Sequence, residues 1–300
     1  MKTKLIALFI VAIFFVANVV RAESKVLLRL NLQKGTTYEM TMATANNIDQ
    51  EMMGQKMKLD QKVEMAFTYQ VLDVLPSKNF IIEYSVVKIT MNMNMNGREM
   101  NVDTGSADAS NPGNAALKGL IETKVKFELT PKGQVEWAVG LDEYAKKLSA
   151  NPQMAQSMPM FTDEKNFKSF IGQTFNYFPE TEVTKGSKWT SSYKLLSLMN
   201  METTMNFEVA DIKTDQVALN ITSDVNINAP IEQQGMKMDM KMTGTQTGTA
   251  VINPTDGWLR SSDLTQKFDV KMKMKNPQSG EDMEIPMLMN SVAKITVVKK

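Results

Sequence analysis

Apolar and polar residues alternate along most of this chain, and methionine often takes the apolar positions. Met91, Met93 and Met95 alternate with asparagine, and the runs 236–242 and 272–274 alternate methionine with lysine or aspartate. A period of two is typical of β-strands with one apolar and one solvated face. The pattern predicts a mainly β protein whose strands are antiparallel and present an adaptable, Met-rich inner face.

The strands are expected to be long. One parity from Met57 to Val71 is apolar apart from Gln61, which predicts a strand of about 15 residues, or roughly 50 Å. Such strands favour a curved half-barrel or barrel-like sheet over a compact sandwich. The apolar parity switches at Val86-Val87, which predicts a β-bulge. The alternation of Val26, Leu28, Leu30 and Leu32 predicts a first strand.

Two helices are expected in the middle of the chain. Leu141 to Ala150 has helical spacing and ends at Asn151-Pro152, and Thr162 is the expected N-cap of a second helix that closes before Pro179. They divide the chain into a first β-half (23–140), a helical connector (141–180) and a second β-half (181–300). The motif Lys34-Gly35 before Tyr38 recurs as Lys185-Gly186 before Trp189, which suggests a duplication; one continuous meander with recurring turns is the alternative.

The first 22 residues predict a cleaved secretory signal peptide. Lys2 and Lys4 precede an apolar run from Leu5 to Val20, and cleavage is expected after Ala22. No later apolar run reaches the roughly 20 residues needed to span a bilayer. The chain contains no cysteine, so neither disulfides nor a lipobox is expected. We expect export to the periplasm or envelope of a Gram-negative bacterium, and not as a lipoprotein.

Charge and composition exclude several functions. The chain carries 34 Lys+Arg and 33 Asp+Glu; without Lys2, Lys4 and Arg21 the counts are 31 and 33, a net charge of −2. These charges are interspersed, so no nucleic-acid partner is predicted. With no histidine and no cysteine, a Ser-His-Asp triad, a cysteine nucleophile and zinc or haem sites with such ligands cannot be built. No cofactor is predicted.

Three chemistries remain open. Paired carboxylates of the glycosidase type are conceivable, but Asp and Glu alternate with Lys as surface charges would. Ser191 and Lys194 fit the S-x-x-K spacing of a serine–lysine dyad, although on a strand rather than at a helix start. Thioether ligands suit Cu(I), and the candidate ligands are Met93, Met95, Met236 and Met238. The simpler interpretation is that these methionines form the apolar face of a sheet.

The pattern resembles two groups of proteins. A signal sequence, long curved strands and covering helices resemble the LolA-like periplasmic carriers of lipoproteins. The KG-x-x-aromatic opening at Lys34-Gly35-Thr36-Thr37-Tyr38 and the frequent methionine resemble uncharacterised exported β-rich proteins of Bacteroidota. The first resemblance implies a lipid or lipidated protein as partner, and neither implies specific contact residues.

The sequence therefore favours a non-enzymatic binding protein that holds a lipid or another hydrophobic ligand in an apolar concavity. The alternatives are a Cu(I)-binding periplasmic protein and a structural or interaction module of the envelope. No oligomeric state is predicted. The residues expected to line the ligand are Met65, Phe67, Met91, Met93, Met95, Met238, Met240, Phe268 and Met272.

Overall fold

The computed structural model describes residues 24–52, 54–106, 114, 117–121, 123–149, 161, 163–195, 201–233, 236–275 and 281–300. The expected signal peptide lies outside these residues. The elements are β1 Thr37–Met52, β2 Gln55–Val74, β3 Phe80–Met95, β4 Arg98–Asp103, β5 Lys124–Leu129, β6 Val135–Val139, α2 Leu141–Ser149, α4 Glu164–Thr174, β7 Lys188–Leu195, β8 Met201–Ile212, β9 Val217–Gln233, β10 Met236–Ile252, β11 Leu259–Lys275 and β12 Asp282–Lys299.

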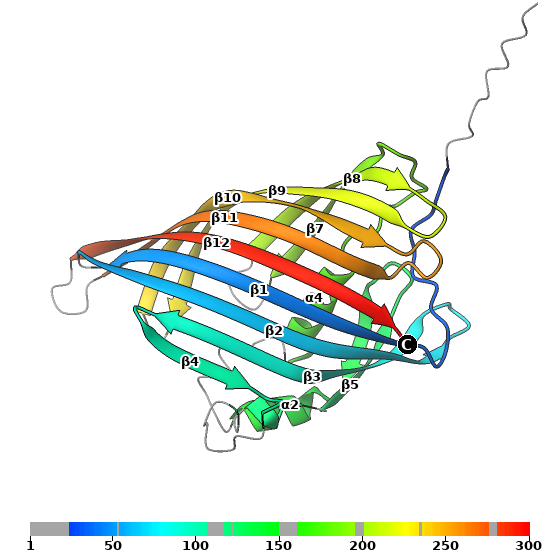
Figure 1. The fold of residues 1–300 in the computed structure, drawn as a ribbon, viewed down its shortest axis with the longest axis horizontal. Helices are drawn as coiled ribbons and strands as arrows, with labels where there is room; N and C mark the ends of the chain where they lie inside the picture. The colour runs from blue at the N-terminus through cyan, green and yellow to red at the C-terminus, as the bar shows by residue number, and fades with distance from the viewer. Residues whose placement is uncertain are drawn as a thin grey trace, which may run out of the picture.

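All twelve strands form one antiparallel, curved sheet that does not close. The order is β6-β5-β3-β2-β1-β12-β11-β10-β9-β8-β7, and β4 pairs with β3 beside this path. Neighbouring strands are thus consecutive in sequence except at two places: β3 pairs with β5, because β4 lies beside the path, and β1 pairs with β12 in the middle (Figure 1). The predicted mainly β fold with long strands is confirmed, and β2 is 20 residues long.

The helix α4 lies between the two edges of the sheet. It packs against both edge strands, β6 and β7, and buries Phe167 and Ile171 against the inner face. Its N-cap is Asp163, whose carboxylate accepts a hydrogen bond from the Asn166 backbone N–H (2.8 Å), rather than the expected Thr162. Asp163 precedes the first helical turn directly, and a carboxylate there also interacts favourably with the helix dipole.

The expected first strand is the one element that the structure corrects. Val26 forms only an isolated bridge with Val183, and Leu30 and Asn31 donate their backbone N–H groups to Pro131 and Asp256 in two other segments. Its backbone bonds are therefore spread over three segments instead of one ladder. The leucines alternate because this extended segment buries one side.

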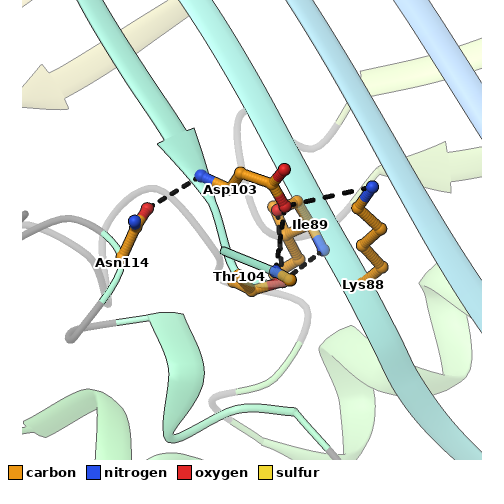
Figure 2. Close-up of polar contacts among 6 residues, drawn as sticks. Lys88, Ile89, Asp103, Thr104 and Asn114 are labelled. Carbon is orange, nitrogen blue, oxygen red and sulfur yellow. Dashed lines mark hydrogen bonds and ion pairs between the residues drawn. The ribbon is translucent and has the colours of Figure 1, made fainter. Parts of the chain in front are cut away.

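The predicted β-bulge is present at Val87 of β3. The register with β2 shifts there, between the pairs Ala66–Lys88 and Phe67–Val86. Before the bulge β3 pairs with β5, and after it with β4. Where β3 changes partner from β5 to β4, Thr104 replaces the missing strand neighbour. Its hydroxyl accepts from the Ile89 N–H (2.9 Å), and its own N–H donates to the Ile89 carbonyl (3.0 Å) (Figure 2).

The two KG turns have the same local construction. Gly35 and Gly186 have positive φ angles of 86° and 82°, and each donates its N–H to a valine carbonyl, Val71 or Val209, at 2.8 Å. Glycine reaches this backbone region without strain. The recurring turn chemistry is thus real, whereas the duplication of the two β-halves stays a prediction.

Candidate functional site

The inner face of the sheet has two apolar zones. The first, which we call the aromatic core, surrounds Trp258. Tyr38 stacks on Trp258 with ring centroids 4.0 Å apart, and Tyr69 meets the same ring edge-on at 5.5 Å. Tyr144 of α2 and Phe167 of α4 cover the core and are fully enclosed. The protein's own side chains fill this zone.

The second zone, the Met-lined zone, lies further along the same strands. Val225, Ile227, Met240 and Val270 are buried there, and partly buried Ala229, Met242, Phe268, Met272 and Met287 pack around them. Both helices lie away from the end at which β1, β2, β11 and β12 extend furthest, on the left of Figure 1. Many methionines here keep solvent-accessible surface: Met57, Met93, Met242, Met272, Met274, Met283, Met287 and Met289 are only half-buried.

The residues predicted to line a ligand all occupy inward-facing positions but divide between the zones. Phe67 and Met65 belong to the aromatic core, with 1% and 9% exposure. Met91, which is half-buried, also packs against this core. The other six belong to the second zone or its edge: Met93, Met95, Met238, Met240, Phe268 and Met272. Met95 is 47% exposed.

The candidate copper ligands lie on two strands. Met93 and Met95 belong to β3, whereas Met236 and Met238 belong to β10, and four strands separate β3 from β10 in the sheet order. Register instead aligns Met238, Met274 and Met283 on three successive strands. Among the described residues no cluster of carboxylates offers a metal site. Thioether binding of Cu(I) stays a prediction.

Between the two zones a row of uncharged polar side chains crosses six strands. Each member stands directly opposite the next in the strand register. We call this row the polar belt, and it consists of Ser223, Gln246, Gln266, Ser291, Asn46 and Gln61.

Hydrogen bonds link most of the polar belt. Gln266 Nε2 donates to Gln246 Oε1 (2.7 Å), Ser291 Oγ to Asn46 Oδ1 (2.6 Å), and Asn46 Nδ2 to Gln61 Oε1 (3.2 Å). Ser223 Oγ donates to the Thr204 carbonyl at 2.7 Å. One buried donor of the belt remains unpaired: Gln246 is 3% exposed, and its Nε2 has no hydrogen-bond partner. An unpaired buried amide of this kind costs about 1–3 kcal/mol.

Two glycines flank Gln246 on the inner side of β10. A Cβ atom on Gly244 would lie 2.6 Å from Phe268 Cδ1, and one on Gly248 would lie 2.7 Å from Leu264 Cδ2. Phe268 and Leu264 stand opposite these glycines in register, so their side chains lie across the bare backbone on either side of Gln246.

A separate groove of about 700 Å³ runs along α4 at the gap between the sheet edges. Polar residues dominate its lining, among them Lys132, Lys168, Glu180 and Ser191. Lys132 pairs with Glu180, and Ser191 donates its hydroxyl to Asn176 Oδ1. The Ser191 hydroxyl thus bonds an amide rather than a lysine, and the Lys194 side chain lies outside the described residues.

The buried tyrosines of the core are held in their neutral form. Burial raises the pKa of Tyr38, Tyr69, Tyr84, Tyr144 and Tyr177 above the ordinary tyrosine value. For Tyr38 the nearby Asp256 carboxylate, which accepts its hydroxyl at 3.1 Å, raises the pKa further. Inward positions from the polar belt to the far end, in the described parts of β1–β3 and β9–β12, carry no charged side chain.

Sequence reasoning missed the polar belt, although a signal was present. Gln61, Ser223 and Gln266 each interrupt an otherwise apolar parity. Singly they look like ordinary variation along a strand. Only the register shows that the interruptions fall at one level.

The sequence places this protein in a family without an assigned activity. The chain belongs to DUF6263, a family of unknown function whose profile matches residues 77–259. Comparison with curated proteins gives no match. No helix within the described ranges has the length and apolarity to cross a membrane.

Solved structures show only distant likeness. A lipovitellin structure concerned with lipid–protein interactions has a TM-score of 0.47 and 10% identity, covering 90% of this chain and 26% of lipovitellin. OmpF of Salmonella typhi in complex with daunomycin scores 0.25 at 6% identity, covering 90% of this chain and all of that one. OccK7 of Pseudomonas aeruginosa scores 0.22 at 3% identity, covering 88% and 100%. At these scores the likeness carries no argument.

Proposed function

We propose that this protein is an exported, non-enzymatic binding protein that holds a hydrophobic ligand against its Met-lined zone. The N-terminal signal pattern supports export to the periplasm or envelope of a Gram-negative bacterium. The resemblance of the sequence pattern to LolA-like carriers points to a lipid or a lipidated protein as the ligand.

One observation carries the proposal: the contrast in burial along a single sheet face. In the aromatic core Tyr38, Phe67 and Tyr69 are 1–2% exposed, whereas on the same sheet face further out Met272, Met287 and their neighbours keep accessible surface. Methionine is flexible and polarisable, and it recurs on surfaces that accept varied apolar partners. Covering this zone removes apolar surface from water at about 25 cal/mol per Å².

The reach of the zone fits an acyl chain. Gln246 and Met238 lie eight residues apart on β10, which is about 27 Å of strand. Half of a bilayer's hydrocarbon core, the depth that one acyl chain occupies, is about 15 Å. The zone is therefore long enough for an extended acyl chain to lie along the strands.

Native mass spectrometry of the gently purified mature protein, together with titration of a fluorescent ester of a fatty acid, tests the proposal. We expect a bound apolar molecule or saturable probe uptake. Met287→Gln, on the inner face, should weaken uptake at least tenfold, because it places an amide against the ligand. Leu288→Gln changes the adjacent residue, which is 55% exposed on the outer face, and should change nothing.

A protein that is empty on purification and takes up no probe would refute the proposal. Equal effects of the two substitutions would also contradict it, because binding would then not depend on the inner face.

A further inference from the structure

We propose that the polar belt binds the uncharged, hydrogen-bond-accepting group of an amphipathic lipid, and that Gln246 Nε2 is the donor. The inference rests on the proposed function and names its ligand class. The lipid would offer an ester carbonyl or a hydroxyl oxygen to the belt and lay its apolar chain along the Met-lined zone.

The Gln246 amide carries a buried donor that no group of the protein uses. Gln246 Oε1 accepts from Gln266, but Nε2 of the same amide is buried without a partner. Buried polar groups in proteins are nearly always hydrogen-bonded, so an orphan donor calls for an explanation. A ligand oxygen at this level would satisfy it.

The described inward positions at and beyond the belt carry no charge. The belt consists of amides and hydroxyls, and no lysine or arginine faces inward between it and the far end within the described strands. A carboxylate bound here would be buried without a counter-charge, which is far more costly than burying a neutral oxygen. The inner face therefore selects for neutral polar groups and against free fatty acids.

The backbone on either side of Gln246 is bare along β10. Gly244 and Gly248 leave no side chain beside Gln246 along β10 itself, and on the β11 side the space over them is taken by Phe268 and Leu264. Phe268 is half-buried and borders the Met-lined zone. A shift of this one ring would open a way from the zone to Gln246 Nε2, with flexible methionines around it.

The test compares three probes of equal chain length on the mature protein: the methyl ester of a long-chain fatty acid, the free acid at pH 8, and the alkane. We expect the ester to bind about tenfold more tightly than either of the others, which corresponds to one hydrogen bond. Gln246→Leu should abolish this preference and leave alkane binding unchanged or tighter. Gln50→Leu makes the same change at a half-buried inner position outside the belt and should preserve the preference.

The outcomes separate the two proposals. If none of the probes binds, both proposals fail. If all three bind alike and Gln246→Leu alters nothing, hydrophobic binding stands and the belt assignment is overturned. Equal loss of ester and alkane binding in Gln246→Leu would also overturn it, because the residue would then be merely structural.

Discussion

The buried tyrosines predict a steep loss of stability at high pH. Burial raises the pKa of Tyr38, Tyr69, Tyr84, Tyr144 and Tyr177 in the folded state, whereas the unfolded chain keeps a value of about 10. A raised folded pKa gives stability that is complete below pH 10 and is lost as the pH rises through the folded value. Within that window each tyrosine lowers the free energy of unfolding by about 1.4 kcal/mol per pH unit, so the five together lower it by about 7 kcal/mol per pH unit.

That loss is comparable with the whole stability of a typical domain, about 5–15 kcal/mol. We therefore expect cooperative unfolding one to two pH units above about pH 10. The assay records tyrosinate absorbance and circular dichroism during a rising pH titration. The two signals should change together, because these tyrosines ionise only when the core opens. Ionisation near pH 10 of more than one of the chain's six tyrosines, with an intact dichroism signal, would refute the reasoning.

Two substitutions sharpen this test. The Tyr84 hydroxyl is buried without a partner, so Tyr84→Phe should raise stability at neutral pH by about 1 kcal/mol. The Tyr177 hydroxyl donates to the Gly257 carbonyl at 3.0 Å, so Tyr177→Phe should lower it by about the same amount. Both should reduce the alkaline slope by about one fifth. Effects of the same sign at neutral pH would contradict the assigned contacts.

Three further predictions concern the sheet. Gly244→Ala places a Cβ atom 2.1 Å from the Lys267 carbonyl oxygen and should lower stability by about 1–3 kcal/mol in thermal unfolding. The control Gly172→Ala in α4, whose Cβ atom would meet nothing within 4 Å, should be neutral or stabilising. Equal effects of the two substitutions would contradict the close approach at Gly244. Thr104→Val should speed hydrogen exchange at the Ile89 amide and cost about 1–3 kcal/mol; unchanged exchange would mean that Thr104 does not secure the split in β3. In anaerobic Cu(I) titration, Met93→Leu with Met95→Leu should leave metal uptake unchanged; loss of a stoichiometric site would favour the copper alternative.

The inner face could be predicted from sequence because a strand has a fixed period of two. Parity alone assigns Met272 and Phe268 to one side of β11, and the structure agrees. The switch at Val86-Val87 marked the bulge for the same reason. The helix Leu141–Ser149 followed from its spacing. These features depend only on neighbours along the chain.

What could not be predicted depends on contacts between distant segments. Asn46 and Ser291 are 245 positions apart and meet only because β1 pairs with β12. The place of α4 between β6 and β7 likewise follows from the curvature of the whole sheet. Leu28 and Leu30 alternate like a strand, yet nothing local shows that their backbone partners belong to separate segments.

The polar belt also solves a problem that repetitive strands create. Met238 and Met240 of β10 face Met274 and Met272 of β11, so a slip of two residues would still place methionine opposite methionine. Alternating apolar residues therefore specify the face of these strands strongly but their register weakly. The pairs Gln246–Gln266, Ser291–Asn46 and Asn46–Gln61 fit only one register, because after a slip of two residues each of these amides would face an apolar partner.

Register specification accounts for every bonded atom of these three pairs and leaves Gln246 Nε2 unused. The register role explains Gln246 Oε1, which accepts from Gln266, but it does not explain the same amide's Nε2, whose burial without a partner costs about 1–3 kcal/mol. A residue kept at such a cost is expected where binding, rather than folding, requires it. The ligand assignment thus depends on Gln246 Nε2, and the comparison of ester and alkane binding tests this atom.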